Sequence, residues 1–250
     1  MTHRYFSQSP LVGDQALLVG SEAHHLVHVM RARPGARVVL FDGGGAEYDA
    51  VVERPGRSRV ELRLTARREV DREAAVAITL GVALPKGERQ RWLVEKAVEL
   101  GVRRLVPLAT ARSVAQPGEH VLERLRRTVV EASKQCGRNR LMEIAPPQGL
   151  ADYVGAAGPR VLRLLAHARA DPERDVEEVP RGPPTLEPPA GGGAYLAVGP
   201  EGGFTEDEVG LAGATGWQVV DLGPRTLRVE TAALVLVTLA LSGSVSVRRG

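Results

Sequence analysis

The chain has 250 residues, of which 43% are hydrophobic, and its formal net charge at pH 7 is +3. This is enough apolar chain to bury one large core or two small ones. No run of 18 apolar residues occurs and the N-terminus lacks a signal-peptide pattern, so we expect neither a membrane span nor secretion. The single cysteine, Cys136, excludes an internal disulfide and favours a cytoplasmic location.

Residues 1–70 have the pattern of a small β-barrel. Strand-like stretches at 38–41, 47–53 and 58–64 are separated by turns rich in Pro and Gly. The arginines of this part could form a phosphate-binding face, but nearby Asp and Glu nearly balance them, so a solvated rim explains them equally well. These arginines are Arg4, Arg31, Arg33, Arg37, Arg57 and Arg59.

A cluster of three histidines raises the question of a metal site. The spacing of His24 and His28 places both on one helix face, as in zinc sites, with His25 beside them. No Cys, Asp or Glu follows at ligand spacing, and a tetrahedral site needs further ligands. We therefore expect no metal and assign these histidines to helix packing or RNA contact.

The charged stretch 65–75 is the best candidate boundary, dividing the chain into domains 1–70 and 71–250. Beyond it a strand, a helix and a second strand follow one another over residues 75–108. Such a βαβ unit implies a parallel sheet with a right-handed crossover. The second domain is therefore predicted to be α/β.

A long helix is predicted over residues 119–135. Between Arg103 and Arg140 the chain carries nine basic and three acidic residues, which is its strongest charge imbalance. Such an imbalance suits an RNA backbone. An arginine-rich, exposed helix face is the competing interpretation.

The first of two Gly/Pro loops follows a short apolar strand at 195–198. The loop itself is Gly199-Pro200-Glu201-Gly202-Gly203, in which three glycines allow the backbone to approach a ligand closely. Thr205 and Glu208 then form the pattern of a capping box at a helix start. An ordinary βα turn also explains this loop when it is considered alone.

The second loop follows a strand predicted at 217–222. The sequence LGPRTLRVE at 222–230 brings two arginines and a glutamate to a helix entrance. Ligands of parallel α/β sheets bind at the carboxyl ends of strands, in loops of this kind. The apolar run at 232–241 must be buried on more than one side, either inside the domain or at a subunit interface.

The motifs VGPEGGFT and LGPRTLRVETA together resemble the SPOUT class of RNA methyltransferases, and most of all the RsmE family, which methylates N3 of a uridine in 16S ribosomal RNA. HHLVHVMRARPGARVVLFDGGGAEYDAVVE resembles the PUA-like domain of that family, and LPKGER, WLVEKAVELGVRRLVPL and QCGR resemble its further motifs. The resemblance implies an N-terminal PUA-like β-barrel and a C-terminal SPOUT α/β domain with a parallel sheet and a deep trefoil knot. It also implies a homodimer that acts on 16S rRNA or the small ribosomal subunit.

The resemblance further implies S-adenosylmethionine as methyl donor, held by the ends of three strands and their loops. The implied cofactor-binding residues are Leu165, His167, Gly199, Pro200, Glu201, Gly202, Gly203, Leu222, Gly223, Arg225, Leu227 and Arg228. The chain differs from the family pattern at one position next to these residues. Family members usually carry Glu after the histidine, whereas this chain has Ala168.

Methylation of N3 requires removal of its proton and stabilisation of the resulting charge. By residue type, Glu201 and Glu230 are candidate bases. Arginine does not act as a base but can stabilise the anion, which makes candidates of Arg225, Arg228 and Arg138. The predicted catalytic residues are Arg228, Glu230, Glu201 and Arg138.

Two other classes of protein compete with this hypothesis. One is a non-catalytic RNA-binding protein in which a barrel is joined to a degenerate α/β domain. The other is a nucleotide-binding enzyme such as a small kinase, and the lack of a Gly-Lys-Ser/Thr phosphate loop argues against it. A donor pocket would distinguish the methyltransferase from both.

Overall fold

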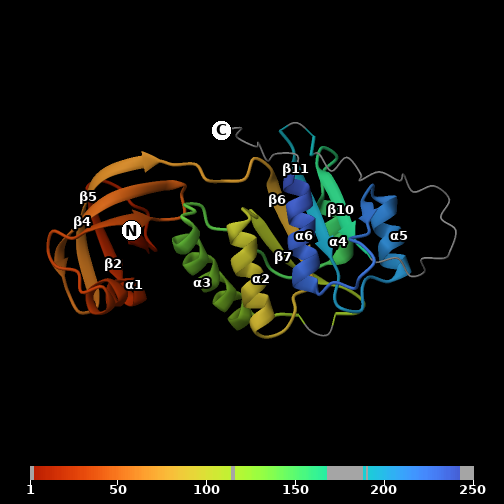
Figure 1. Cartoon of the computed structure of the whole chain (residues 1–250), viewed down its shortest axis with the longest axis horizontal. Helices are drawn as coiled ribbons and strands as arrows, with labels where there is room; N and C mark the ends of the chain where they lie inside the picture. The colour runs from red at the N-terminus through yellow and green to blue at the C-terminus, as the bar shows by residue number, and fades with distance from the viewer. Residues whose placement is uncertain (1–2, 114–115, 168–187, 190, 243–250) are drawn as a thin grey trace. The chain divides into compact units, whose positions relative to one another are not determined.

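The computed structural model describes residues 3–113, 116–167, 188–189 and 191–242 (Figure 1). By its internal contacts the chain divides into two compact units. The first unit combines Met1–Glu73 with Val129–Leu141, and the second combines Ala74–Thr128 with Met142–Gly250. The predicted boundary between domains 1–70 and 71–250 remains a prediction.

The first unit contains a curled sheet of five strands in the order β1-β3-β4-β5-β2. Its strands are β1 (Arg4–Phe6), β2 (Gln15–Val19), β3 (Arg37–Phe41), β4 (Ala46–Pro55) and β5 (Arg59–Glu69). The β1–β3 pair is parallel and the others are antiparallel. Two register shifts in the long β4–β5 pair are of the kind that bends a sheet. The prediction of a β-rich N-terminal part is confirmed.

The early histidines lie in a short helical segment. Helix α1 (Gly20–His24) continues into η1 (His25–Val29), a turn of π-helix. The rings of His24 and His28 are 4.7 Å apart between centroids, which agrees with the predicted shared face. Across the residues that the structure describes, no group of three or more His, Cys, Asp or Glu side chains is placed to hold a metal.

The segment 129–141 is bound into the first unit by polar contacts. Lys134 Nζ donates to Glu22 Oε1 at 2.8 Å, and both side chains are largely buried. Arg138 donates from Nε to Glu73 at 2.8 Å, and its own side chain is only 4% exposed. Breaking a buried pair of this kind leaves an uncompensated charge, so these contacts fix the segment to the unit.

Glu47 is a buried carboxylate shared by two arginines of the same unit. Burial alone would raise its pKa, but hydrogen bonds from Arg4 and Arg72 outweigh that effect and lower the pKa below its usual value. The carboxylate therefore stays ionised at neutral pH. Arg4, one of the arginines considered for a phosphate-binding face, is instead held at 2.7 Å from Glu47.

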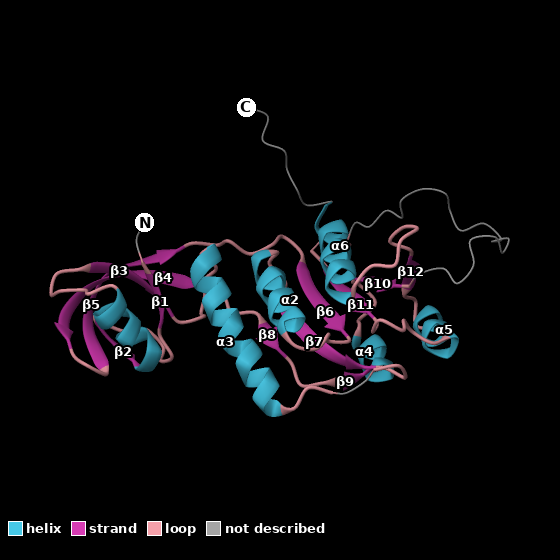
Figure 2. Ribbon diagram, turned by 60° about the horizontal axis from the view of Figure 1, so that its bottom comes forward, coloured by secondary structure: helices cyan, strands magenta, loops and turns pink. Residues whose placement is uncertain are grey.

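The second unit is built on a parallel sheet in the order β12-β10-β11-β6-β7-β8, with β9 paired to β7 (Figure 2). Its strands are β6 (Ala77–Val82), β7 (Arg104–Ala109), β8 (Glu143–Ile144), β9 (Gln148–Gly149), β10 (Leu162–Ala166), β11 (Gly193–Val198) and β12 (Gln218–Val220). Every pairing is parallel, as predicted from the βαβ pattern. The short β8, β9 and helix α4 were not anticipated.

Helices cover both faces of this sheet. They are α2 (Glu88–Glu99), α4 (Leu150–Ala156), α5 (Glu206–Ala214) and α6 (Val229–Ser242), while α3 (Glu119–Cys136) runs from the second unit into the first. Helix α6 packs against β6, β10 and β11 and lies beside α2, whereas α4 packs against β7 and α5. No helix in the described part of the chain is long and apolar enough to cross a membrane.

Tyr153 of α4 lies in the core between α4 and the sheet. Its side chain is fully buried, and its hydroxyl lies 2.9 Å from the carbonyl oxygen of Leu196 in β11 and 3.1 Å from that of Thr79 in β6. The ring packs directly on Gly81 of β6. Burial raises the pKa of the phenol far above its ordinary value, so the hydroxyl keeps its proton as a donor.

We predict that Gly81→Ala destabilises the second unit. The added Cβ would lie 2.6 Å from two carbons of the buried Tyr153 ring, so the free energy of unfolding should fall by about 1–3 kcal/mol. Urea unfolding monitored by Trp92 and Trp217, both in this unit, measures the change.

Gly210→Ala is the matched control. Gly210 is exposed in α5 and a Cβ there meets nothing within 4 Å, so stability should rise by roughly 0.5–1 kcal/mol. Equal unfolding midpoints for the two variants would contradict the packing described for Tyr153.

Candidate active site

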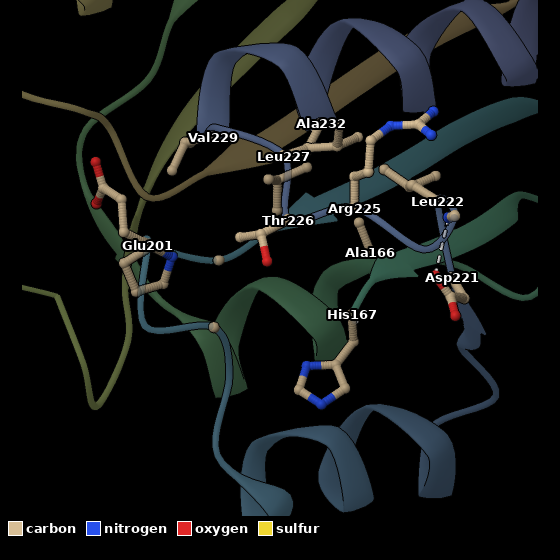
Figure 3. A pocket seen from close by; sticks show the side chains of 15 residues that line it. Ala166, His167, Glu201, Asp221, Leu222, Arg225, Thr226, Leu227, Val229 and Ala232 are labelled. Carbon is tan, nitrogen blue, oxygen red and sulfur yellow. Dashed lines mark hydrogen bonds between the residues drawn. The ribbon is translucent and has the colours of Figure 1, made fainter. Parts of the chain in front are cut away.

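A pocket lies at the carboxyl ends of β10, β11 and β12, where the two Gly/Pro loops meet (Figure 3). It contains about 600 Å³ of empty space, part of it open to solvent. The lining residues are Ala166, His167, Val198, Gly199, Pro200, Glu201, Gly203, Asp221, Leu222, Gly223, Arg225, Thr226, Leu227, Val229 and Ala232. The parallel register brings these distant segments to one sheet edge.

The loop after β11 is held in one conformation by its own backbone and by a neighbouring loop. Gly203 N–H donates to the Pro200 carbonyl at 2.8 Å, and Gly203 has φ +69°, a conformation that favours glycine. Arg112, which follows β7, donates to the Gly202 carbonyl. These bonds leave the loop's backbone shaped around the pocket before any ligand arrives.

The helix that follows this loop begins with the predicted capping box. Thr205 Oγ1 accepts from the Glu208 amide at 3.3 Å, and the Glu208 carboxylate accepts from the Thr205 amide at 2.8 Å. Glu208 also accepts from the Ala111 amide at 2.8 Å. The start of α5 is thereby joined to the loop after β7, so both ends of the Gly199–Phe204 segment are fixed.

The second loop contributes a carboxylate and an apolar wall. Asp221 accepts from the Gly223 amide at 2.9 Å, an arrangement that tightens the turn after β12. Leu227 and Val229 face the interior of the pocket in Figure 3, while the guanidinium of Arg225 points away from His167. The pocket therefore combines an apolar surface with acidic groups at its margins.

His167 has the buried polar atom most suited to a ligand. Its backbone N–H donates to the Val220 carbonyl at 3.1 Å, which sets the ring at the end of β10. Its Nδ1 is buried and, among the described residues, has no hydrogen-bond partner. A buried nitrogen in that state is destabilising unless something bonds to it, and it lines the pocket.

Two carboxylates, Glu201 and Glu230, are bridged by Arg89 of α2. Arg89 Nη2 donates to Glu201 Oε1 at 3.0 Å, and its Nη1 lies 3.7 Å from Glu230 Oε2. A hydrogen bond from its own backbone amide lowers the pKa of Glu201, and nearby Arg89 and Lys86 add to that lowering against the opposing effect of burial. Glu201 is thus ionised at neutral pH and able to accept a proton.

Glu230 differs from Glu201 in its surroundings. Its side chain is 8% exposed, against 55% for Glu201, and it lies in the first turn of α6, where the helix dipole favours a negative charge. Its Oε2 has no hydrogen-bond partner within the described chain. Arg89 is therefore the cation that compensates this buried carboxylate.

Nine of the twelve predicted cofactor-binding residues line the pocket, and Leu165, Gly202 and Arg228 do not. The side chain of Leu165 points to the face of β10 opposite to that of Ala166 and is buried in the core with α4 and α5. Gly202 directs its carbonyl to Arg112, and Arg228 is exposed at the start of α6.

The remaining predicted catalytic residues are spread over the fold. Glu201 lines the pocket and Glu230 lies behind it, but Arg138 belongs to the first unit, paired with Glu73. Ala168, where the chain departs from the usual Glu, lies outside the described residues.

Sequence reasoning missed several residues of the site. Arg89 is 112 residues from Glu201, and its only signal was its place in the first turn of a helix after a Lys-Gly turn. The lining residues Asp221 and Thr226 were overlooked beside predicted neighbours. A carboxylate just after a strand end, as at Asp221, is the type of group that binds ribose hydroxyls.

Comparisons with known proteins agree with this geometry. Residues 72–241 match the RNA methyltransferase domain family, and residues 18–65 match the RNA methyltransferase PUA domain family. The chain is 34% identical over 230 residues to the ribosomal RNA small subunit methyltransferase E of Synechocystis, covering 87% of this chain and 70% of that protein. The Mycobacterium tuberculosis protein of the same name is 35% identical, with 92% and 87% covered.

Solved structures give the same picture. A Legionella pneumophila protein, determined with the bound cofactor SAM, superposes with a TM-score of 0.83 at 30% identity, covering 97% of this chain and 98% of that one. A ribosomal RNA small subunit methyltransferase E from Neisseria gonorrhoeae bound to S-adenosyl methionine gives 0.81 at 29% identity, with 95% and 96% covered.

Proposed function

The chain belongs to the RsmE family of RNA methyltransferases, and on this premise we propose that it transfers a methyl group from S-adenosylmethionine to N3 of a uridine in 16S ribosomal RNA, in the cytoplasm. The observation that carries this proposal is the pocket formed by both loop motifs. Its lining combines apolar side chains, a fixed loop backbone and a buried nitrogen that has no hydrogen-bond partner in the described part of the chain.

The residues of this pocket fit the proposed donor. An adenine ring suits the apolar wall of Leu222, Leu227 and Val229, and Asp221 can accept from ribose hydroxyls. His167 Nδ1 can hydrogen-bond to a polar group of the same molecule. When bound, S-adenosylmethionine supplies an electrophilic methyl group on a positively charged sulfur, which retains the bonding electron pair as the methyl leaves.

Proton removal is the part of the reaction that the protein must supply. The lone pair of N3 forms the new bond to carbon, and the N3 proton must move to an acceptor. We assign that acceptor to Glu201, because its carboxylate lines the pocket and is ionised at neutral pH. Glu230, which holds Arg89 from the other side, is proposed to position that guanidinium.

The two arginines of the predicted catalytic set receive different roles in this proposal. Arg228 is exposed beside the pocket loop, which supports contact with RNA or with the developing negative charge. Arg138 is paired with Glu73 in the first unit, which supports a structural role there. The excess of basic residues between Arg103 and Arg140 supports ribosomal RNA or the small subunit as partner.

A homodimer and a trefoil knot are kept as parts of the proposal. Helix α6 buries Ala233, Leu236 and Val237 against the sheet, while Leu234 and Leu239 stay only partly buried. Apolar side chains that stay partly exposed on this helix support a subunit interface. The knotted threading is proposed from the loop motifs alone.

We predict that S-adenosylmethionine raises the melting temperature by roughly 5 °C at about 100 times its Kd, whereas ATP and NAD do not. His167→Ala should weaken donor affinity about tenfold, because a buried hydrogen bond to the donor is lost. Calorimetry measures both effects. His120→Ala, an exposed histidine of α3, is the matched control and should bind like the parent.

If millimolar S-adenosylmethionine does not shift the melting temperature, the proposal of a methyltransferase is refuted. The non-catalytic RNA-binding protein would then be the better description, since it predicts RNA affinity without a donor site.

We predict that Glu201→Gln lowers single-turnover methylation of small ribosomal subunits by about 10²- to 10⁴-fold, with donor affinity nearly unchanged, because the proton acceptor is lost. Glu230→Gln and Arg228→Ala should also lower turnover more than donor affinity. Glu206→Gln, an exposed carboxylate of α5, is the control. If all three variants methylate at the parent rate, the catalytic roles assigned to these residues are wrong.

We predict a dimer in light scattering at micromolar concentration. Replacing Leu234 and Leu239 by Lys should convert it to a monomer, because the charges would have to be buried at the interface. Leu211→Lys, at an exposed leucine of α5, serves as the control for added charge. A monomeric parent would contradict the proposed interface.

A further inference from the structure

A second cavity adjoins the first on the same edge of the parallel sheet. It encloses about 670 Å³ of empty space, part of it open, at the carboxyl ends of β6, β7 and β11. Its lining residues are Ala83, Leu84, Pro85, Lys86, Arg89, Leu108, Ser113, Pro117, Pro200 and Glu201. Nothing in the proposed donor site uses the β6 and β7 side of this edge.

The two cavities share one piece of wall. Pro200 and Glu201 line both, so the loop after β11 separates them, with its carboxylate accessible from each side. A molecule in the second cavity would therefore be the immediate neighbour of a molecule in the first. Group transfer requires such adjacency, since donor and acceptor atoms must come into contact.

The side chains of the second cavity suit a planar, anionic ligand. Leu84, Leu108 and Pro117 provide apolar surface for a flat ring. Lys86 is a cation that can attract a negatively charged group, while the charge of Arg89 is shared between Glu201 and Glu230. A nucleotide within an RNA chain has both properties, because it combines an aromatic base with a phosphate.

Arg89 is held in place in a way that suits recognition. Gly87, with φ +68°, turns the chain into α2 and places Lys86 before the helix and Arg89 in its first turn. Glu201 and Glu230 then bracket the guanidinium at 3.0 and 3.7 Å. A guanidinium has five N–H groups, so two carboxylate contacts leave donors for a ligand.

The pair formed by Glu201 and Arg89 presents an acceptor directly beside a donor. The imide edge of uracil carries the opposite pattern, the N3–H donor beside a carbonyl acceptor. Cytosine presents an unprotonated N3 beside an amino group, which would set acceptor against carboxylate and donor against guanidinium. The pair therefore distinguishes the two pyrimidines by charge-assisted hydrogen bonds.

We infer that the second cavity binds the acceptor nucleotide, with Glu201 and Arg89 contacting the imide edge of its uracil and Lys86 contacting a phosphate. This inference rests on the proposed function and names the substrate site beside the donor pocket. As the N3 proton passes to Glu201, the negative charge left on the ring is stabilised by Arg89. The guanidinium thus both selects the base and favours its reactive anion.

The test uses the full chain and two fluorescently labelled nine-nucleotide probes, oligouridylate and oligocytidylate. Anisotropy should show tighter binding of oligouridylate by the parent, and Arg89→Ala should lose that preference, roughly tenfold or more. Lys86→Ala should weaken both probes equally and reduce the salt dependence by about one ion. Arg91→Ala, an exposed arginine of the same helix, is the matched control and should resemble the parent.

Donor calorimetry on each protein separates the possible failures. A parent that does not bind S-adenosylmethionine refutes the proposed function. A parent that binds the donor but does not distinguish the probes, or an Arg89→Ala protein that keeps the preference, overturns the acceptor site alone. If Arg89→Ala loses donor binding through misfolding, Glu201→Ala decides: it removes the acceptor of the pair at a half-exposed position, and a parent-like preference in it refutes the donor–acceptor pair.

Discussion

The parallel alignment of β10, β11 and β6 is the constraint on which the rest of the site depends. Their paired residues end together at Ala166, Val198 and Val82, so three loops that are far apart in the chain begin at one edge. Tyr153 secures this alignment from below, since its hydroxyl reaches carbonyl groups on two neighbouring strands. The loops can be rich in glycine because the strands beneath them are rigid.

Much of this arrangement could be predicted from the sequence because it is local. The capping box of Thr205 and Glu208, the strand ending at Val198 and the helix after Gly87 are each specified by residues within one or two turns. Strand alternation also has local rules. The side chain of Leu165, predicted to bind the cofactor, is buried in the core, and the adjacent Ala166 lines the pocket.

The contacts that could not be predicted join residues distant in the chain. Arg89 and Glu201 form a pair only because β6 and β11 are neighbours in the sheet. The local sequence around either residue does not predict this contact. Charge counts have the same weakness. Arg4 and Arg138 add to a basic surface when counted, yet in the fold each is bound to a glutamate. Only the structure distinguishes a paired arginine from one that is available to a phosphate.

The first unit is assembled from two segments of chain that are separated by more than fifty residues of the other unit. Glu22, one of its buried carboxylates, has its lysine partner 112 residues later, at Lys134. On a ribosome that adds about 5–20 residues per second, this delay amounts to roughly 6–22 s. Glu22 of a nascent chain therefore emerges well before the lysine that pairs with it, and the final packing of the first unit is postponed until β6, α2 and β7 have all been translated.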